Sequence, residues 1–406
     1  MTEKNNCLPW TWPPRDYSPQ EAIDRYLKNG GSLTPKGREG IVGECEDALC
    51  RRFDQPRAVL CCSGTMALYA AFFAVDLGPG DELICPTITF HATASPALRL
   101  GASVVLVDVD EETACIDPAA LEAVISPRTK AVVTNAQWGH PVEQDRIRAI
   151  CDRNGLAWIE DISHAHGATW NGRQVGTWGD LACMSLGAEK MLAGGMAGVL
   201  FGKRDDLVDR AVLVTHYLHR SAKDIRTPGF EPLARTGYGL KLGVHPLAAV
   251  VVLDQLQNHF DRWVAERNDS LSRMMKRLSG LPGLRPPVVR PEVTSMGGWY
   301  GFKPWVDFEK LGITREALVE NFHALGLEVD VPGSPPLHDF PLFSEARWNP
   351  VANSIGSDHL TSAKSYSAGI LSLPTFTGSR DESGLLEMIL AFHRVWQGFS
   401  FAETEM

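Results

Sequence analysis

The sequence has no long apolar segment and no excess of positive charge. None of its apolar runs approaches the roughly 18 residues that a membrane-spanning helix needs. Its start, Met1-Thr-Glu-Lys-Asn-Asn6, lacks the basic and then apolar layout of a secretory signal peptide. The formal net charge is −10, so the chain has no general attraction for phosphate backbones or anionic lipid. These absences argue against membrane and nucleic-acid partners and favour a cytoplasmic protein.

Regularly spaced cysteines are also missing. The nine cysteines are scattered, and the adjacent pair Cys61 and Cys62 is poorly placed to bind one zinc ion or to form a disulfide. An odd and irregular set predicts reduced thiols and no metal site. Repeats, low-complexity tracts and runs of like charge are absent too. With 44% apolar and 22% charged residues, the 406-residue chain has an ordinary globular composition and is long enough for two or three domains.

Short apolar runs alternate with helical stretches between residue 41 and about residue 205. An apolar run without polar alternation indicates a strand buried on both faces, and strand–helix alternation indicates a mostly parallel sheet with helices on both sides. The predicted fold class is therefore α/β. The predicted strands are 82–85, 104–108, 131–134, 157–160, 181–185 and 198–201, and the predicted helices are 41–54, 65–77, 118–125 and 143–153.

The two ends of the chain differ from this alternating region. The first 40 residues are rich in proline and aromatic residues and predict an irregular arm with one short helix near 18–28. One long helix is expected over 245–276, with Pro246 in its first turn. Helices are also expected near 314–325 and 380–396 in a second, α+β domain. The predicted divisions are an arm over 1–40, a large domain over 41–265 and a small C-terminal domain over 266–406.

Three features of the alternating region point to chemistry. Lys190 lies between small residues and the glycine pair Gly194-Gly195, which leave little side-chain cover. Asp161 follows an apolar run and so lies at the carboxyl end of a predicted strand, where ligands collect in parallel sheets. Ser63-Gly64-Thr65 opens a predicted helix with hydroxyls and free amides that suit a phosphate. An amine to hold an aldehyde as a Schiff base, a carboxylate to keep a pyridine nitrogen protonated and a phosphate-binding turn are the requirements of pyridoxal phosphate (PLP).

Each of these residues also has an ordinary structural explanation. Serine and threonine commonly cap helices, aspartate commonly begins turns, and most lysines are solvated surface charges. Phe90 either stacks on the cofactor ring or packs in the core. His164 is placed to hydrogen-bond the cofactor oxygen or the substrate, whereas His166 is better explained as a satisfied structural histidine. The order of the features in one alternating domain, with Ser185 at a further strand end, favours the cofactor site.

Longer motifs resemble those of the DegT/StrS-type sugar aminotransferases, which are PLP enzymes of fold type I. The resemblance is dense from about residue 40 to residue 205 and weaker toward the C-terminus, where Pro336–His338 and Leu371–Pro374 match family landmarks. It implies a large PLP-binding domain, a smaller C-terminal domain, and homodimers in which both subunits build each site. The matching motifs are Ser63–Leu68, Gly78–Ile84, Pro86–Thr93, Val107–Asp110, Trp138–Pro141, Glu160–Ala168, Val175–Asp180 and Ser185–Lys190.

Carried over by position, the resemblance implies a role for each candidate residue. Lys190 falls at the Schiff-base lysine and Asp161 at the partner of the ring nitrogen. His164 falls near the cofactor oxygen, where a histidine is similar to the cyclitol and aminohydroxybenzoate branch of the family, and Phe90 falls at the stacking position. Gly64, Thr65 and Ser185 fall at phosphate contacts of the family, and Ser63 belongs to the same predicted phosphate-binding turn.

Three positions depart from the family pattern. The family's Gly-Glu-Gly-Gly after the lysine is Gly195-Met196-Ala197-Gly198 here, so its acid is missing. In the family's Gly-Tyr-Asn-Tyr-Arg, Gly239 replaces the asparagine that reaches the neighbouring subunit's phosphate. Lys241 replaces the arginine and lacks its fork of donors. The changes leave the cofactor side largely intact and leave the amino donor and the acceptor open.

The resemblance implies an aminotransferase that moves an amino group from glutamate or glutamine to a keto group of a sugar, nucleotide sugar or cyclitol, in antibiotic or aminosugar biosynthesis. Lys241 is a candidate to share a local basic pocket with Lys190. Loss of the acid at Met196 leaves dehydration or cyclisation open, although Lys190 argues against the dehydratase branch, which has histidine there. A non-catalytic regulator that binds PLP is the third possibility. Candidates to line the acceptor pocket are Trp10, Trp12, Trp138 and Tyr238.

Overall fold

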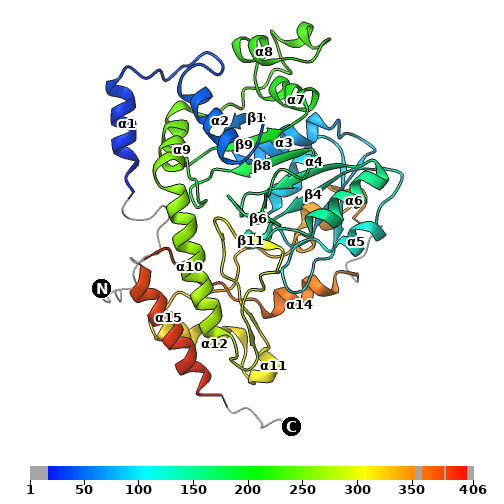
Figure 1. Cartoon of the computed structure of the whole chain (residues 1–406). Helices are drawn as coiled ribbons and strands as arrows, with labels where there is room; N and C mark the ends of the chain where they lie inside the picture. The colour runs from blue at the N-terminus through cyan, green and yellow to red at the C-terminus, as the bar shows by residue number, and fades with distance from the viewer. Residues whose placement is uncertain (1–16, 353–358, 379–380, 400–406) are drawn as a thin grey trace.

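The centre of the molecule is a seven-stranded sheet (Figure 1). The computed structural model describes residues 17–352, 359–378 and 381–399. Every neighbouring pair of strands is parallel except those made by β9, which is antiparallel to both β1 and β8. The predicted α/β fold with a mostly parallel sheet is thus confirmed. In spatial order the strands are β1 (Arg57–Cys61), β9 (Gly198–Gly202), β8 (Leu181–Ser185), β5 (Ala157–Asp161), β4 (Thr129–Asn135), β2 (Glu82–Pro86) and β3 (Ser103–Val107).

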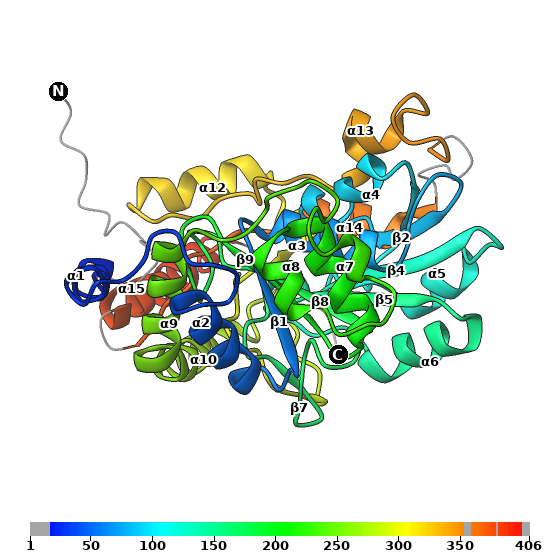
Figure 2. The same cartoon turned by 90° about the horizontal axis from the view of Figure 1, so that it is seen from above.

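Helices cover both faces of this sheet, as Figure 2 shows from above. One face packs on α3 (Gly64–Ala74), α4 (Ser95–Arg99) and α7 (Asp205–Thr215). The other packs on α2 (Ile41–Arg52) and α9 (Pro246–Asn258) at the β1 side, and on α5 (Pro118–Ala123) and α6 (Gln144–Asn154) farther along. Because successive strand side chains point to opposite faces, a sheet covered on both sides requires uninterrupted apolar runs. This requirement explains why the strands could be predicted from the sequence.

The C-terminal residues bury a core of their own around α10 (Phe260–Leu278), α12 (Arg315–Ala324) and α15 (Glu382–Trp396). In Figure 1, α10 runs down from the sheet to these helices. The first turns of α10 contribute Phe260 and Trp263 to a core that packs on the sheet, and later turns contribute Met274 and Leu278 to the C-terminal core. The predicted boundary at residue 265 falls inside this helix, and the division into domains stays a proposal.

The single helix predicted over 245–276 is wrong. His259, with φ −134° and ψ −34°, leaves the helical conformation and separates α9 from α10. Its ring packs between those of Tyr17 and Trp263, with centroids 5.2 and 5.0 Å away. Apolar periodicity continues across the break, so no sequence pattern marks it, and only the packing of these rings shows where the chain turns.

The remaining elements are short. The helix predicted near 18–28 is confirmed as α1 (Pro19–Lys28), whose first turn is capped by Ser18. The others are α8 (His219–Asp224), α11 (Phe308–Leu311), α13 (Pro341–Ser344), α14 (Thr361–Gly369), β6 (Thr169–Trp170), β7 (Arg173–Gln174), β10 (Leu284–Arg285), β11 (Val293–Ser295) and β12 (Trp305–Val306). In the described residues no helix has the length and apolarity to cross a membrane. Their eight cysteines are all free thiols.

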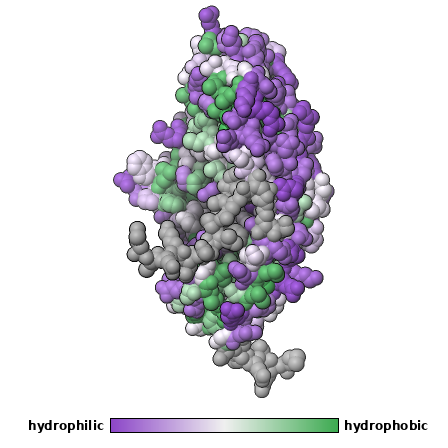
Figure 3. Space-filling view, turned by 90° about the vertical axis from the view of Figure 1, so that its left-hand side faces the viewer, coloured by the Kyte–Doolittle hydropathy of each residue, from purple (hydrophilic) through white to green (hydrophobic). Residues whose placement is uncertain are grey.

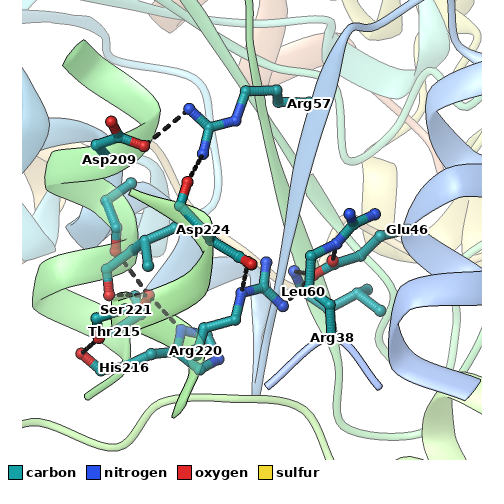
Figure 4. Close-up of polar contacts among 12 residues, drawn as sticks. Arg38, Glu46, Arg57, Leu60, Asp209, Thr215, His216, Arg220, Ser221 and Asp224 are labelled. Atoms are coloured by element: carbon teal, nitrogen blue, oxygen red, sulfur yellow. Dashed lines mark hydrogen bonds and ion pairs between the residues drawn. The ribbon is translucent and has the colours of Figure 1, made fainter. Parts of the chain in front are cut away.

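A buried network of ion pairs holds α7 and α8 against β1 and α2 (Figure 4). Arg57 of β1 pairs with Asp209 of α7 at 2.8 Å and donates to the Asp224 carbonyl at 3.0 Å. The Asp224 carboxylate pairs with Arg220 at 2.5 Å, and Arg220 reaches the fully buried Glu46 of α2 at 3.0 Å. Removing one member would leave an uncompensated buried charge, so the network fixes this corner of the fold.

The segment after α8 returns from this corner to the sheet. The Cys62 N–H donates to the Leu242 carbonyl at 2.7 Å, directly before α3 begins. Gly239 within the segment has φ +79°, a left-handed conformation that glycine adopts freely and that asparagine tolerates better than most residues. The replacement of the family's asparagine therefore suits this backbone conformation while removing the side-chain amide.

Candidate functional site

One cavity of about 710 Å³ lies where β5 and β8 end. All eight residues predicted for the cofactor site line it: Ser63, Gly64, Thr65, Phe90, Asp161, His164, Ser185 and Lys190. The opposite wall comes from C-terminal residues, namely Tyr300, Lys303, Pro332, Gly333, Ser334 and Ser372. The predicted residues are therefore brought together, and residues from the sheet side and from the C-terminal part of the chain both enclose the cavity.

The amino end of α3 forms one end of this cavity. Ser63 caps the helix, with its Oγ accepting the Met66 N–H at 3.2 Å. A Cβ on Gly64 would lie 2.7 Å from the Ser185 Cβ, and a Cβ on Gly198 would lie 2.4 Å from the Gly64 nitrogen. Only glycine allows these close approaches, which bring the free amides of the helix against the end of β8. Such amides and the helix dipole attract an anion.

The two acids at the end of β5 point to opposite faces. Asp161 lines the cavity, is 7% exposed, and accepts the Thr93 hydroxyl at 2.8 Å and the Ser163 N–H at 3.1 Å. Glu160 lies on the other face and accepts three backbone N–H groups, from Gly176, Trp178 and Gly179, at 2.9, 2.8 and 2.6 Å. Asp161 is thus the acid available to a ligand, and Glu160 orders a turn.

Lys190 presents a desolvated amine to the cavity. Burial lowers the pKa of Lys190 to about 8, although Asp161 and Glu189 oppose the shift. Its Nζ lies 3.9 Å from the centre of the Tyr300 ring. An amine with this pKa is partly neutral near physiological pH and is a usable nucleophile.

His166 holds the loop that carries Lys190. Its Nδ1 accepts the Leu192 N–H at 3.2 Å, so its Nε2 donates to the Ser185 carbonyl at 3.0 Å. Burial lowers the pKa of His166 to about 3, so the ring is neutral. The prediction of a satisfied structural histidine is confirmed.

Aromatic rings join the two lysines of the cavity in a row. The His164 ring stacks on Tyr300 with centroids 3.9 Å apart and on Trp138 with centroids 5.8 Å apart. Lys190 adjoins the Tyr300 ring, and the Lys303 Nζ lies 4.8 Å from the centre of the Trp138 ring. Burial, together with the charge of Lys190, keeps the pKa of His164 well below its usual value, so this histidine is neutral.

The aromatic candidates and Lys241 differ in whether they reach this cavity. Phe90 lines the cavity with 53% of its surface exposed, so the core-aromatic alternative is wrong. Trp138 lines the cavity as predicted, but Tyr238 packs on Phe73 with centroids 4.7 Å apart and does not line it. Lys241 is exposed and absent from this wall, so within this chain Lys303 and not Lys241 is the second lysine beside Lys190. Two further candidates, Trp10 and Trp12, lie outside the described residues.

Tyr300, Lys303 and Ser372 were missed by the sequence reasoning. Tyr300 and Lys303 belong to a stretch without helical or strand periodicity, which carried no signal for a site. Ser372 lies in the landmark Leu371–Pro374, where nothing in the sequence marks it as a site residue. Met196, at the position of the missing acid, also lines the cavity and is 79% exposed.

A second hollow, of about 750 Å³, lies between α1, α2 and α9. It includes neither Lys190 nor Asp161, so the chemistry belongs to the first cavity. No group of three or more His, Cys, Asp or Glu residues in the described ranges is arranged to hold a metal ion.

Comparisons with known proteins agree with this geometry. An L-glutamine:2-deoxy-scyllo-inosose aminotransferase of Streptoalloteichus tenebrarius is 31% identical over 86% of this chain and 83% of its own. DesV of S. venezuelae, solved with a ketimine intermediate, superposes with a TM-score of 0.80 at 26% identity over 94% of this chain and 95% of its own. A Streptococcus pneumoniae protein described as a putative sugar aminotransferase, solved in its PLP form, has a TM-score of 0.79 over 96% of this chain and 98% of its own; at 22% identity it shows the fold alone. The model of the DegT/DnrJ/EryC1/StrS aminotransferase family matches residues 19–384, so the chain belongs to this family and is a PLP-dependent aminotransferase of fold type I.

Proposed function

We propose that this protein transfers the amino group of L-glutamine or L-glutamate to the keto group of a cyclitol or a related sugar, in the biosynthesis of an aminosugar or antibiotic. The observation that carries the proposal is the desolvated amine of Lys190 in one cavity with Asp161 and the amino end of α3. The similarity to a glutamine-dependent cyclitol aminotransferase supports this donor and this class of acceptor.

The residues fit PLP at each of its polar groups. The free amides of α3, with Ser63, Gly64, Thr65 and Ser185, would hold the phosphate, because Gly64 and Gly198 keep side chains out of this corner. Asp161, which is buried and has only neutral hydrogen-bond partners among the described residues, would keep a proton on the ring nitrogen. When bound, PLP would supply an aldehyde that carries the amino group from donor to acceptor and a pyridine ring that withdraws electrons.

The other residues would position and move protons. Neutral His164 would donate to the ring oxygen, and Phe90 at the open side of the cavity would cover one face of the ring. Lys190 would bind the cofactor aldehyde covalently and, once released by the donor, would move a proton between the donor carbon and the cofactor carbon. A pKa of about 8 suits an amine that must serve both as nucleophile and as base.

We also propose a cytoplasmic homodimer. On the side of the molecule where α1 and α15 lie, apolar residues gather in an upper and a lower area (Figure 3). Leu386 and Leu390 of α15 are 49% and 62% exposed, and Leu27 of α1 is 44% exposed. Exposed apolar surface of this kind is typical of contacts between chains. Light scattering would test the dimer.

Trapping the covalent link tests the catalytic assignment. Borohydride added to the PLP-loaded protein should leave a reduced pyridoxyl group on the peptide that contains Lys190, and none should form in Lys190→Ala. Lys310→Ala, on exposed α11, is the matched control and should label like the parent. A label on another lysine would refute the assignment. Release of the keto acid from L-glutamine tests transamination, and its absence with every amino donor would favour the dehydration or cyclisation that Met196 left open.

A further inference from the structure

The cavity contains a second desolvated lysine, to which the proposed chemistry gives no role. Lys303 lines the wall opposite the sheet and donates to the Ser372 hydroxyl. Its ammonium lies 4.8 Å from the centre of the Trp138 ring. Within the described residues Lys303 forms no ion pair. The carboxylate that acts on its pKa, Asp330, has a side chain that is 65% exposed and that lies 3.4 Å from His323 instead.

The backbone directs Lys303 into the cavity. Phe302 and Pro304 on either side of it pair with the segment that carries Ser372, through the Leu373 N–H at 3.1 Å and the Leu371 N–H at 2.9 Å. Ser372 itself is bonded on its other edge to Asp330. These hydrogen bonds hold the backbone on both sides of Lys303, whose side chain points toward Trp138.

Glycine at position 301 leaves the room that the lysine stem occupies. A Cβ on Gly301 would lie 2.8 Å from the Lys303 Cε and 3.1 Å from the Trp138 ring. The Gly301 N–H donates to the Trp138 carbonyl at 3.1 Å, and Trp138 is held at φ +56°, a strained conformation for a residue with a side chain. Strain and close contact thus hold the Trp138 ring and the Lys303 ammonium together at one end of the aromatic row.

The Lys303 ammonium lies in the cavity and has no counter-ion among the described residues, so it calls for an anionic ligand, because a desolvated charge is costly unless it is paired. Burial lowers the pKa of Lys303 to about 8, which agrees with a missing anion. Asp161 is engaged on the far side of the site, by the Thr93 hydroxyl and the Ser163 N–H, and Lys190 is the nucleophile. Of the two proposed substrates, the amino acid carries an obligatory carboxylate, whereas a keto-cyclitol carries none.

We propose that Lys303 binds the α-carboxylate of the amino donor, with the Ser372 hydroxyl as a second donor and the Trp138 ring as the wall of the subsite. This assignment rests on the proposed function of the cavity. A neutral acceptor that enters later would present hydroxyl groups to the same ammonium, so one subsite would serve both half-reactions.

Binding without turnover tests the proposal. α-Methyl-L-glutamine has no α-proton to lose and carries only the α-carboxylate, so its dissociation constant from the PLP-loaded protein, measured by calorimetry, reports recognition of that group. Lys303→Met should raise this constant about 10- to 150-fold, the range expected for one hydrogen bond to a charged group. Lys303→Arg should recover part of the loss, and Lys310→Met should bind like the parent.

A ligand without the carboxylate separates recognition from a structural role. 4-Aminobutanamide has the chain of glutamine and no α-carboxylate, so Lys303→Met should change its dissociation constant less than about threefold. The difference between the two ligands measures the coupling between Lys303 and the carboxylate, as in a double-mutant cycle. Equal losses for both ligands, or no loss for α-methyl-L-glutamine, would overturn the assignment. Borohydride labelling of Lys190 in Lys303→Met checks cofactor loading. If no keto acid forms from any donor, the proposed function fails, and these constants still decide the role of Lys303.

Discussion

Replacing Gly64 by alanine adds one methyl group at the most closely packed point of the site. The new Cβ would lie 2.7 Å from the Cβ and 2.9 Å from the Cα of Ser185. Carbon atoms in contact normally lie about 3.5 to 4.0 Å apart. The overlap with the Ser185 Cβ is therefore at least ~0.8 Å, taken as 3.5 minus 2.7. A rotamer change of Ser185 cannot relieve the overlap, because the Ser185 Cα belongs to the backbone at the end of a central strand.

The helix start must then move away from Ser185 by most of an ångström. Overpacking of this size costs about 1 to 3 kcal/mol, and misplacing a binding group by about 1 Å commonly costs about a hundredfold in site function. We expect Gly64→Ala to weaken PLP binding by about 10- to 100-fold, since the phosphate would contact both displaced elements. The melting temperature of the cofactor-free protein should fall by a few degrees.

Gly78→Ala is the matched control. A Cβ at Gly78 meets no atom within 4 Å, and its φ is not in the left-handed region, so the same methyl group adds no overlap there. PLP dissociation constants from fluorescence titration, with thermal melts of both cofactor-free variants, would compare the two. If Gly64→Ala binds PLP and melts like Gly78→Ala, the reasoning about the close approach is wrong.

Two further predictions concern Lys190 and Glu160. The rate of PLP attachment to the cofactor-free protein should rise with pH with a midpoint near 8, because only the neutral amine of Lys190 attacks and its pKa lies there. Stopped-flow absorbance would measure the rate, and a midpoint near 10.5 would contradict the prediction. Glu160→Ala should destabilise the protein by about 3 to 5 kcal/mol, because it leaves three backbone N–H groups without an acceptor. Glu160→Gln, which keeps one carbonyl oxygen, should lose less in urea denaturation, and equal losses would argue that water replaces the carboxylate.

Local patterns explain how much of the fold could be predicted. Strands such as β4 and β8 are buried on both faces, so their apolar runs were visible in the sequence. The break at His259 was not visible, because α9 and α10 are both helical and apolar residues continue across it. The position of that break depends on rings from Tyr17 and Trp263, and the first of these lies more than 200 residues away in the chain.

The sequence by itself determined the half of the site that lies at the ends of the parallel strands. Ser63, Asp161 and Lys190 each follow or border a strand, and the topology of a parallel sheet brings strand ends to one edge whatever the details of packing. Only the tertiary structure decided the other half. Lys303 and Ser372 lie in irregular segments far from Lys190 in the chain, and their approach depends on how the C-terminal core packs across the cavity. Contacts of that kind leave no periodic pattern, because they are fixed by the three-dimensional fit of distant side chains.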